Sequence, residues 1–227
     1  MPEPAAESAA WPPHGLYAIT DGPRADLCDV ARAALDGGAA VLQYRDKTRD
    51  RDRRLREARA LAELCARFRR PLMVNDDAEL ARATGAVGVH LGEDDPGIGD
   101  ARSILGCGAI IGVSCYDSLV RARDAAAAGA DYLAFGAFFP TTSKAVTRRA
   151  TPRLLREARG MGLPLVAIGG ITPDNGRSLI AAGADFLAAI SGVFGAGDIR
   201  AAARRYAAAF ATDQHGQSRI NGPGRSA

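Results

Sequence analysis

The sequence predicts an α/β protein in which eight parallel strands close into a barrel, and three observations support this. The chain has 227 residues, within the range of about 200–250 residues usual for a single α/β barrel domain. Short apolar segments alternate with amphipathic segments along most of the chain, as in a parallel sheet covered by helices. A glycine–alanine pair also recurs before four apolar segments, at Gly38, Gly85, Gly129 and Gly183.

The strands are predicted from apolar runs of strand length, and the helices from apolar residues spaced three and four apart. The predicted strands are residues 16–20, 40–45, 71–75, 87–91, 109–114, 132–136, 164–169 and 186–191. Helical patterns fill most of the intervals, for example 52–68, 118–128, 152–159, 173–182 and 198–210. Eight such units imply closure into a (β/α)8 TIM barrel.

The ends of the chain differ in composition from the barrel segment between them. Residues 1–13 are rich in alanine, proline and glutamate, and residues 212–227 are polar and glycine-rich. We expect both to be disordered tails around a barrel domain at 14–211. The repeated glycines suit the left-handed residue that ends a helix, so we assign them to architecture rather than to ligand binding.

Composition argues against several classes of partner. A net charge of +3 with 6% aromatic residues does not favour a nucleic-acid surface, and the arginine-rich stretch 49–56 is interpreted as a solvated helix face. No apolar run reaches about 20 residues, so no membrane span is expected. The first residues lack the basic region of a secretory signal. Four cysteines without metal-ligand spacing indicate buried free thiols in a reducing compartment. We therefore expect a cytoplasmic protein, either a monomer or a homo-oligomer.

Polar residues or glycines end seven consecutive predicted strands. In barrels of this class the carboxyl ends of the strands form the functional rim, so we expect one site there. The residues concerned, strand by strand, are Gln43, Arg45 and Lys47; Asn75, Asp76 and Asp77; His90 and Asp95; Ser114; Thr141, Ser143 and Lys144; Gly169 and Gly170; and Ser191.

Gln43, Arg45 and Lys47 alternate along the end of one strand, so their side chains should share a face. An amide and two cations at a buried strand end are costly to desolvate unless an anion meets them. This predicts a ligand that carries phosphate or carboxylate beside a hydrogen-bonding group. The alternative is that the charges reach solvent or pair with Asp46 and Asp50.

Asp76 and Asp95 are candidate Mg²⁺ ligands, because Mg²⁺ takes one or two carboxylates together with substrate phosphate oxygens. Two other roles compete with this one. Asp76 or Asp77 could cap the helix that starts near Ala78, and Asp95 could form a turn before Pro96. We favour capping for Asp77 and metal binding for Asp76.

Two further rim segments have the character of anion sites. Thr141, Ser143 and Lys144 combine hydroxyls, backbone N–H groups and a cation in one loop. Gly170 and Ser191 lie where barrels often bind phosphate, after strands seven and eight. The pair of sites predicts two phosphorylated ligands, or one ligand phosphorylated at both ends.

The residue types at these strand ends favour catalysis by charge stabilisation over catalysis by a strong base. His90 lies within an apolar strand, where a packed pocket wall is at least as compatible as a general base. The sequence shows neither a Ser-His-Asp arrangement nor a strand-interior lysine suited to a Schiff base. Lys47 and Lys144 therefore fit electrostatic stabilisation better than nucleophilic catalysis.

Taken in order and spacing, these motifs resemble those of the thiamine phosphate synthase family of TIM-barrel enzymes. The resemblance covers about residues 15–210. The matching segments are 17–21 (YAITD), 43–47 (QYRDK), 75–77 (NDD), 88–92 (GVHLG), 111–114 (IGVS), 140–144 (PTTSK), 167–171 (AIGGI) and 190–191 (IS).

The resemblance implies a transferase that joins hydroxymethylpyrimidine diphosphate to thiazole phosphate by a Mg²⁺-assisted dissociative substitution. The electron-rich aminopyrimidine would stabilise the cation, while Lys144, Arg45 and Lys47 act as the catalytic cations. By position, the pyrimidine site would hold Gln43, His90 and Ser114; the diphosphate site Arg45, Lys47, Asn75, Thr141, Ser143 and Lys144; the Mg²⁺ site Asp76 and Asp95; and the thiazole phosphate site Gly170, Ile190 and Ser191.

Two positions depart from the family pattern, and other functions compete. Ser143 stands where threonine is usual, and Glu93 where glutamine is frequent, which would add a carboxylate near the metal. The nearest alternative is the related thiazole tautomerase, although Ala137 stands where that branch is expected to carry histidine. A non-catalytic barrel that binds phosphorylated metabolites, and another phosphate-handling barrel enzyme such as an epimerase or aldolase, are the remaining alternatives.

Overall fold

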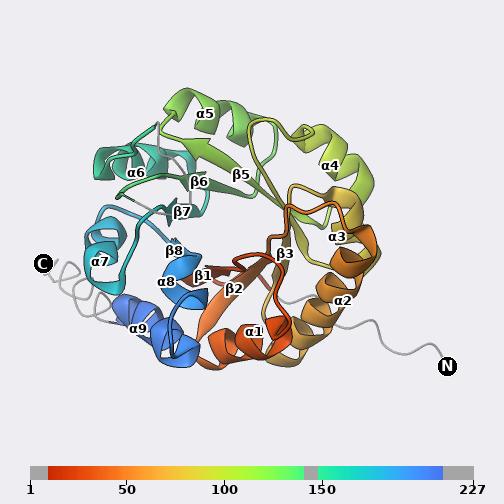
Figure 1. The fold of residues 1–227 in the computed structure, drawn as a ribbon. Coiled ribbons are helices and arrows are strands. Elements are labelled where there is room, and N and C mark those ends of the chain that lie inside the picture. Colours follow the sequence, from red (N-terminus) through yellow and green to blue (C-terminus); the bar gives the residue numbers. More distant parts are fainter. Residues whose placement is uncertain (1–9, 141–147, 212–227) are drawn as a thin grey trace, which may run out of the picture.

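The computed structural model describes residues 10–140 and 148–211, and these form a closed barrel of eight parallel strands ringed by helices (Figure 1). Each strand pairs with its neighbours in the chain, and β8 closes the barrel onto β1. The strands are β1 (Gly15–Ile19), β2 (Ala39–Tyr44), β3 (Leu72–Asn75), β4 (Gly88–Leu91), β5 (Ile110–Tyr116), β6 (Tyr132–Phe135), β7 (Leu165–Ile168) and β8 (Phe186–Ala189). The predicted fold class is confirmed.

The helices form the outer ring of the barrel (Figure 1). They are α1 (Leu27–Asp36), α2 (Arg51–Phe68), α3 (Ala78–Thr84), α4 (Ile98–Leu105), α5 (Leu119–Ala127), α6 (Pro152–Ala158), the short 3₁₀ helix η1 (Arg159–Met161), α7 (Pro173–Ala181), α8 (Ser191–Phe194) and α9 (Ile199–Ala211). Within residues 10–140 and 148–211, no helix combines the length and apolar character needed to cross a membrane.

Five predicted strands end one or two residues earlier than the sequence suggested, and two of these, the second and the eighth, bear on the site. The second stops at Tyr44, so Arg45 and Lys47 lie beyond it. The eighth stops at Ala189 rather than at residue 191, because Ile190 turns out of the extended conformation with φ −104° and ψ −89°. The Ile190 carbonyl then accepts from Val193 and Phe194, and α8 begins at Ser191.

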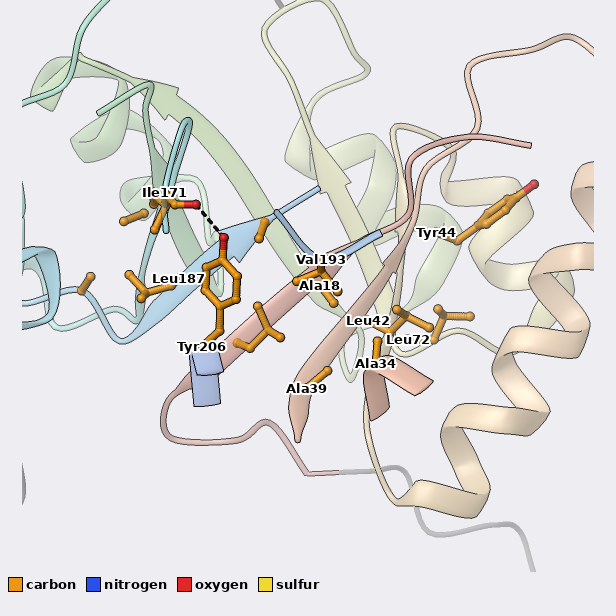
Figure 2. Close-up of a cluster of buried hydrophobic side chains, with 14 of the residues drawn as sticks. Ala18, Ala34, Ala39, Leu42, Tyr44, Leu72, Ile171, Leu187, Val193 and Tyr206 are labelled. Atoms are coloured by element: carbon orange, nitrogen blue, oxygen red, sulfur yellow. Dashed lines mark hydrogen bonds between the residues drawn. The ribbon is translucent and has the colours of Figure 1, made fainter. Parts of the chain in front are cut away.

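The apolar side chains form two layers. The outer layer lies between sheet and helices, where Leu42, Leu72 and Leu187 pack with Tyr206 of α9 (Figure 2). The inner layer fills the barrel and includes Tyr17, Met73, Tyr132, Val166 and Phe186. The barrel is thus a packed core, open for chemistry only at its rim.

Trp11 lies within the segment expected to be a tail, but its ring packs against the inner layer. It stacks on Tyr132 with ring centroids 4.9 Å apart and planes 17° apart. Its centroid is also 5.4 Å from that of Phe186. The alternating period of strands does not extend to this residue, so the sequence pattern gave no signal for it.

The glycine–alanine repeat ends helices, as predicted, and two copies add a further contact. Gly129 and Gly183 adopt φ of +91° and +112°, which glycine reaches without strain. The aspartate that follows each pair accepts from the first residues of an earlier strand: Asp131 from the Ile111 N–H at 2.7 Å, and Asp185 from the Leu165 N–H at 2.8 Å. These carboxylates fasten neighbouring strands at the amino-terminal side of the barrel.

The expectation of buried thiols is correct for two cysteines and wrong for two. Cys65 and Cys115 are buried, whereas Cys28 and Cys107 are exposed, and all four are free. Cys28 is on the outer side of α1, and Cys107 is in the loop before β5, neither of which faces the core.

Gly112 of β5 makes room for the Tyr132 ring, so its replacement tests the packing of the barrel interior. A Cβ at residue 112 would lie 1.9 Å from Tyr132 Cζ. We expect Gly112→Ala to lower the free energy of unfolding in urea by about 2 kcal/mol or more. Gly108→Ala is the matched control, because nothing lies within 4 Å of its added Cβ. Equal effects of the two substitutions would contradict this packing.

Candidate active site

The ends of β2 and β3 bring four of the predicted polar residues into two contacts. Gln43 Nε2 donates to Asn75 Oδ1 at 2.7 Å, and Lys47 Nζ lies 3.0 Å from Asp76 Oδ2. Gln43 is buried, whereas the Lys47 side chain keeps 60% of its surface exposed. A buried amide thus stands beside a cation that can still reach a ligand.

The competing partners for Lys47 are engaged elsewhere. Asp46 accepts from Arg53 Nη2 at 2.7 Å and from the Thr48 N–H at 2.7 Å. Asp50 caps α2 by accepting from the Arg53 N–H. The pairing of Lys47 with Asp46 or Asp50 is therefore wrong, because both carboxylates hold the start of α2.

Asp77 has the capping role predicted for it, whereas Mg²⁺ binding by Asp76 stays a prediction. Asp77 caps α3 by accepting from the Leu80 N–H at 2.9 Å. Asp76 adopts φ +64°, a left-handed conformation that aspartate tolerates better than most residues. Its backbone N–H donates to the His90 carbonyl at 2.8 Å. Backbone strain of this kind concentrates at functional sites, and here it accompanies the carboxylate that meets Lys47.

Asp95 combines a turn with a place beside Asp76. Its Oδ2 accepts from the Gly92 N–H at 2.6 Å, which closes the turn after β4. Burial raises the pKa of Asp95, and the hydrogen bond and charge of Asp76 raise it further. The positive charge of Lys47 acts in the opposite direction. The Asp76 carboxylate thus lies beside that of Asp95 and disfavours the ionisation of Asp95.

This carboxylate pair fits a cation that completes its coordination from the substrate. The described residues contain no group of three or more His, Cys, Asp and Glu placed to hold a metal by themselves. Mg²⁺ does not require such a group, because it is commonly bound by one or two carboxylates, waters and substrate phosphates. A cavity of about 400 Å³ borders Asp76 and is also lined by Lys47 and Asn75, whereas Asp95 lines a second cavity of about 650 Å³.

His90 is held in a line of hydrogen bonds that crosses the barrel interior. Its Nε2 is 2.8 Å from Ser114 Oγ, and its Nδ1 is 2.9 Å from the Tyr132 hydroxyl. Burial lowers the pKa of His90 to about 4, although the charge of Asp76 opposes this. His90 is therefore neutral near pH 7, which supports the interpretation as a pocket wall.

Arg45 and the rim of β5 are fixed through backbone atoms. The Arg45 N–H donates to Thr20 Oγ1 at 2.8 Å. Arg121 donates from Nε to the Ser114 carbonyl at 2.7 Å and from Nη2 to the Gly92 carbonyl at 2.9 Å. The sequence patterns did not identify Thr20 or Arg121 as site residues. Thr20 ends the first predicted strand with a polar residue, which could have identified it, whereas Arg121 gives no comparable signal.

Glu93 and Arg148 form a contact that the sequence did not predict. Glu93 Oε2 lies 3.0 Å from Arg148 Nη1, and the Arg148 guanidinium lies 4.9 Å from the centroid of the Tyr116 ring. The extra carboxylate is thus paired with an arginine far along the chain. This pair links the turn after β4 to the segment that precedes α6.

The loop after β7 packs closely against neighbouring segments. Asn175 Nδ2 donates to the Gly170 carbonyl at 3.1 Å, and the Tyr206 hydroxyl donates to the Ile171 carbonyl at 2.6 Å (Figure 2). A Cβ at residue 170 would lie 2.3 Å from the Pro140 carbonyl oxygen. A Cβ at residue 192 would lie 3.6 Å from the Ile171 carbonyl oxygen. Gly170 and the start of α8, with Ile190 and Ser191, therefore lie on one side of the rim.

Three predicted site residues, Thr141, Ser143 and Lys144, lie outside the described residues. Their role at the diphosphate stays a prediction. The other predicted site residues occupy the carboxyl-terminal rim, in two groups: β2 to β5, and β7 with β8.

Comparisons with known proteins show the family to which the chain is similar. The family model described as thiamine monophosphate synthase matches residues 16–193. The chain is 59% identical over 198 residues to a thiamine-phosphate synthase of Xanthomonas campestris pv. campestris, covering 86% of this chain and 95% of that protein. It is 53% identical over 196 residues to one of Nitrosococcus oceani, covering 85% and 90%.

The chain also aligns with solved structures over most of its length. The thiamine phosphate pyrophosphorylase of Pyrococcus furiosus aligns with a TM-score of 0.79 and 35% identity, covering 87% of this chain and 96% of that chain. A 3-hexulose-6-phosphate synthase aligns with a TM-score of 0.66 at 18% identity, covering 86% and 99%, which shows the fold alone.

The lowered pKa of His90 predicts how stability depends on pH. The folded value of about 4 lies below the unfolded value of about 6.5. Between these values the unfolded chain binds more protons, so the free energy of unfolding should fall as pH drops from about 6.5 to about 4. We expect His90→Gln to remove up to about 3 kcal/mol of this fall.

Chemical denaturation at several pH values measures this slope. His14→Gln, at an exposed position, controls for the loss of one histidine. If His90→Gln keeps the full slope of the unsubstituted protein, the burial of a neutral His90 is contradicted.

Proposed function

The chain belongs to the thiamine monophosphate synthase family, a family of transferases, and from this premise we propose how its rim performs the condensation. The substrates are a pyrimidine carrying a diphosphate and a thiazole carrying a phosphate. The products are thiamine phosphate and diphosphate. The observation that supports the proposal most is the side-by-side placement of the Gln43–Asn75 and Lys47–Asp76 contacts. The first suits a neutral ring, and the second suits the anion attached to it.

We propose that the pyrimidine lies over Gln43, His90 and Ser114. All three are polar without being charged, since His90 is neutral near pH 7. The reaction leaves positive charge on the pyrimidine when diphosphate departs. A neutral His90 adds no second positive charge against that ring, whereas an imidazolium would repel it.

The diphosphate is proposed to lie beside Lys47, Arg45 and Asn75. The Lys47 ammonium is largely exposed and already faces a carboxylate, so it can donate to a phosphate oxygen without a large movement. The backbone of Arg45 is fixed by Thr20, which limits the positions open to its side chain. These cations stabilise the charge of the leaving group as its bond to carbon breaks.

Asp76 and Asp95 are proposed to hold Mg²⁺ together with diphosphate oxygens. The raised pKa of Asp95 beside Asp76 supports this, because two carboxylates at one location gain from a divalent cation. When bound, Mg²⁺ would share the negative charge of the diphosphate as it leaves.

The thiazole phosphate is proposed to lie at Gly170, Ile190 and Ser191, on the side of the rim formed by β7 and β8. Close packing around Gly170 and Ile171 holds the backbone there in place. A fixed phosphate positions the thiazole nitrogen towards the pyrimidine carbon, and such positioning is a large part of catalysis between two substrates.

The thiazole tautomerase remains the alternative function. An isomerisation of one substrate gives no role to the Lys47–Asp76 pair and its neighbour Asp95.

Phosphorylated substrates and four free thiols support a cytoplasmic location, which we also propose.

The direct test supplies both substrates and Mg²⁺ to the purified protein. We expect diphosphate and thiamine phosphate to appear in equal amounts, measured by a coupled diphosphate assay and by chromatography. Isomerisation of the thiazole without condensation would assign the chain to the tautomerase branch instead. Binding of both substrates without turnover would make it a non-catalytic barrel.

A second test concerns the proposed Mg²⁺ ligands. We expect Asp76→Asn to raise the Mg²⁺ concentration needed for half-maximal rate by about tenfold or more, since a charged ligand is lost. Asp77→Asn is the matched control, because asparagine also caps helices and Asp77 caps α3. An unchanged Mg²⁺ requirement in Asp76→Asn would contradict the ligand assignment.

A further inference from the structure

Four side chains form one continuous line of hydrogen bonds through the barrel. Ser114 Oγ lies 2.8 Å from His90 Nε2, and His90 Nδ1 lies 2.9 Å from the Tyr132 hydroxyl. The Tyr132 hydroxyl lies 2.8 Å from that of Tyr17. Ser114 is at the rim, and Tyr17 is at the closed end of the barrel. The line therefore connects the proposed pyrimidine site to the floor of the barrel.

The number of hydrogens in this line exceeds the number of its bonds by one. Burial raises the pKa of Tyr17 and of Tyr132, so both phenols keep their hydrogens. Both nitrogens of the His90 ring lie against hydroxyl groups inside the barrel, where a second N–H would leave an unpaired positive charge, so the ring carries one N–H hydrogen. With the Ser114 hydroxyl, four hydrogens serve three hydrogen bonds. One hydrogen must point out of the line: that of Ser114 at the rim, that of Tyr17, or that of Tyr132 if its hydroxyl accepts from both neighbours.

Among residues 10–140 and 148–211, the floor of the barrel gives that hydrogen no acceptor. Tyr17 and Tyr132 have at most 1% of their surface exposed. Trp11 stacks on Tyr132 and closes this end, with its ring centroid 6.5 Å from that of Tyr17. The Trp11 indole Nε1 is itself a buried donor without a partner among the described residues. A hydrogen that pointed into the floor would be a buried, unsatisfied donor, which is unfavourable because its hydrogen bond to water is lost and not replaced.

The order of the hydrogens then follows. Tyr17 donates to Tyr132, Tyr132 donates to His90 Nδ1, and His90 Nε2 donates to Ser114 Oγ. The hydrogen of Ser114 is left at the open rim. The reverse order would leave the hydrogen of Tyr17 in the floor.

We propose that Trp11 is a positioning residue, which keeps water out of the floor and thereby makes the Ser114 hydroxyl a hydrogen-bond donor to the ligand. The group that such a donor recognises is an acceptor atom, and an unprotonated nitrogen of a heteroaromatic ring is the acceptor that the proposed substrate offers. This identification of the ligand rests on the proposed function, whereas the order of the hydrogens does not.

The ¹⁵N chemical shifts of the histidine ring test the order without any substrate. The chain has three histidines, and the loss of signals in His90→Gln assigns those of His90. In the unsubstituted protein we expect the shift of an unprotonated nitrogen at Nδ1 and that of a protonated nitrogen at Nε2. The opposite assignment would overturn the proposal, and this measurement needs no variant of Trp11.

The paired variants Trp11→Ala and Trp11→Phe test the seal. Alanine opens the floor, so water can accept the hydrogen of Tyr17, both orders become populated, and the two ¹⁵N shifts of His90 move towards each other. Phenylalanine keeps a ring against Tyr132 and should keep the shifts of the unsubstituted protein. Unchanged shifts in Trp11→Ala, or equal changes in both variants, would overturn the role of Trp11.

Kinetics separate this proposal from the proposed function. In Trp11→Ala we expect the KM for the pyrimidine diphosphate to rise about fivefold, the size of one neutral hydrogen bond, with the KM for thiazole phosphate unchanged. An equal rise for both substrates would overturn the assignment of Ser114 as a donor to the pyrimidine. Absence of thiamine phosphate formation by the unsubstituted protein would instead overturn the proposed function and leave the ¹⁵N result valid.

Discussion

Closure of eight parallel strands in chain order is the constraint on which the rest of the molecule depends. Since all strands run the same way, every carboxyl end reaches the same rim, and residues far apart in the chain become neighbours. Three rim contacts join the ends of adjacent strands: Gln43 with Asn75, Lys47 with Asp76, and His90 with Ser114. The amino-terminal side is closed by Trp11 and by the carboxylates of Asp131 and Asp185. One side is thereby built for stability, and the other is left for chemistry.

Charge on the rim is unevenly distributed, and this distribution divides the proposed site into a charged part and a neutral part. Asp76 and Asp95 share one location, where burial and mutual repulsion raise the pKa of Asp95. Lys47 compensates them only in part, because its side chain is largely exposed to solvent. The neighbouring positions that would face the pyrimidine are neutral, with His90 held neutral by burial. A ligand with an uncharged ring and an anionic group matches this division.

The strands and their rim residues could be predicted from the sequence because apolar runs and polar strand ends are local signals. Side-chain alternation predicted that Gln43, Arg45 and Lys47 share one face. In the structure Gln43 and Lys47 contact the consecutive residues Asn75 and Asp76, although β2 ends at Tyr44 and Lys47 lies in the following loop. Contacts over long chain separations gave no local signal. Glu93 forms an ion pair with Arg148. Tyr17 and Tyr132 share a hydrogen bond, but in the sequence both tyrosines look like ordinary core residues. Trp11 lies outside the segments with strand or helix periodicity, so the sequence gave no sign that it packs in the floor of the barrel.

We propose that the carboxylates of Asp76 and Asp95, together with Lys47, form a diphosphate site completed by Mg²⁺. Calorimetric titration of inorganic diphosphate into the purified protein, with and without Mg²⁺, tests it most directly. We expect diphosphate to bind at least about tenfold more tightly when Mg²⁺ is present, because the divalent cation would join the ligand to Asp76 and Asp95. Equal affinity under the two conditions would contradict it.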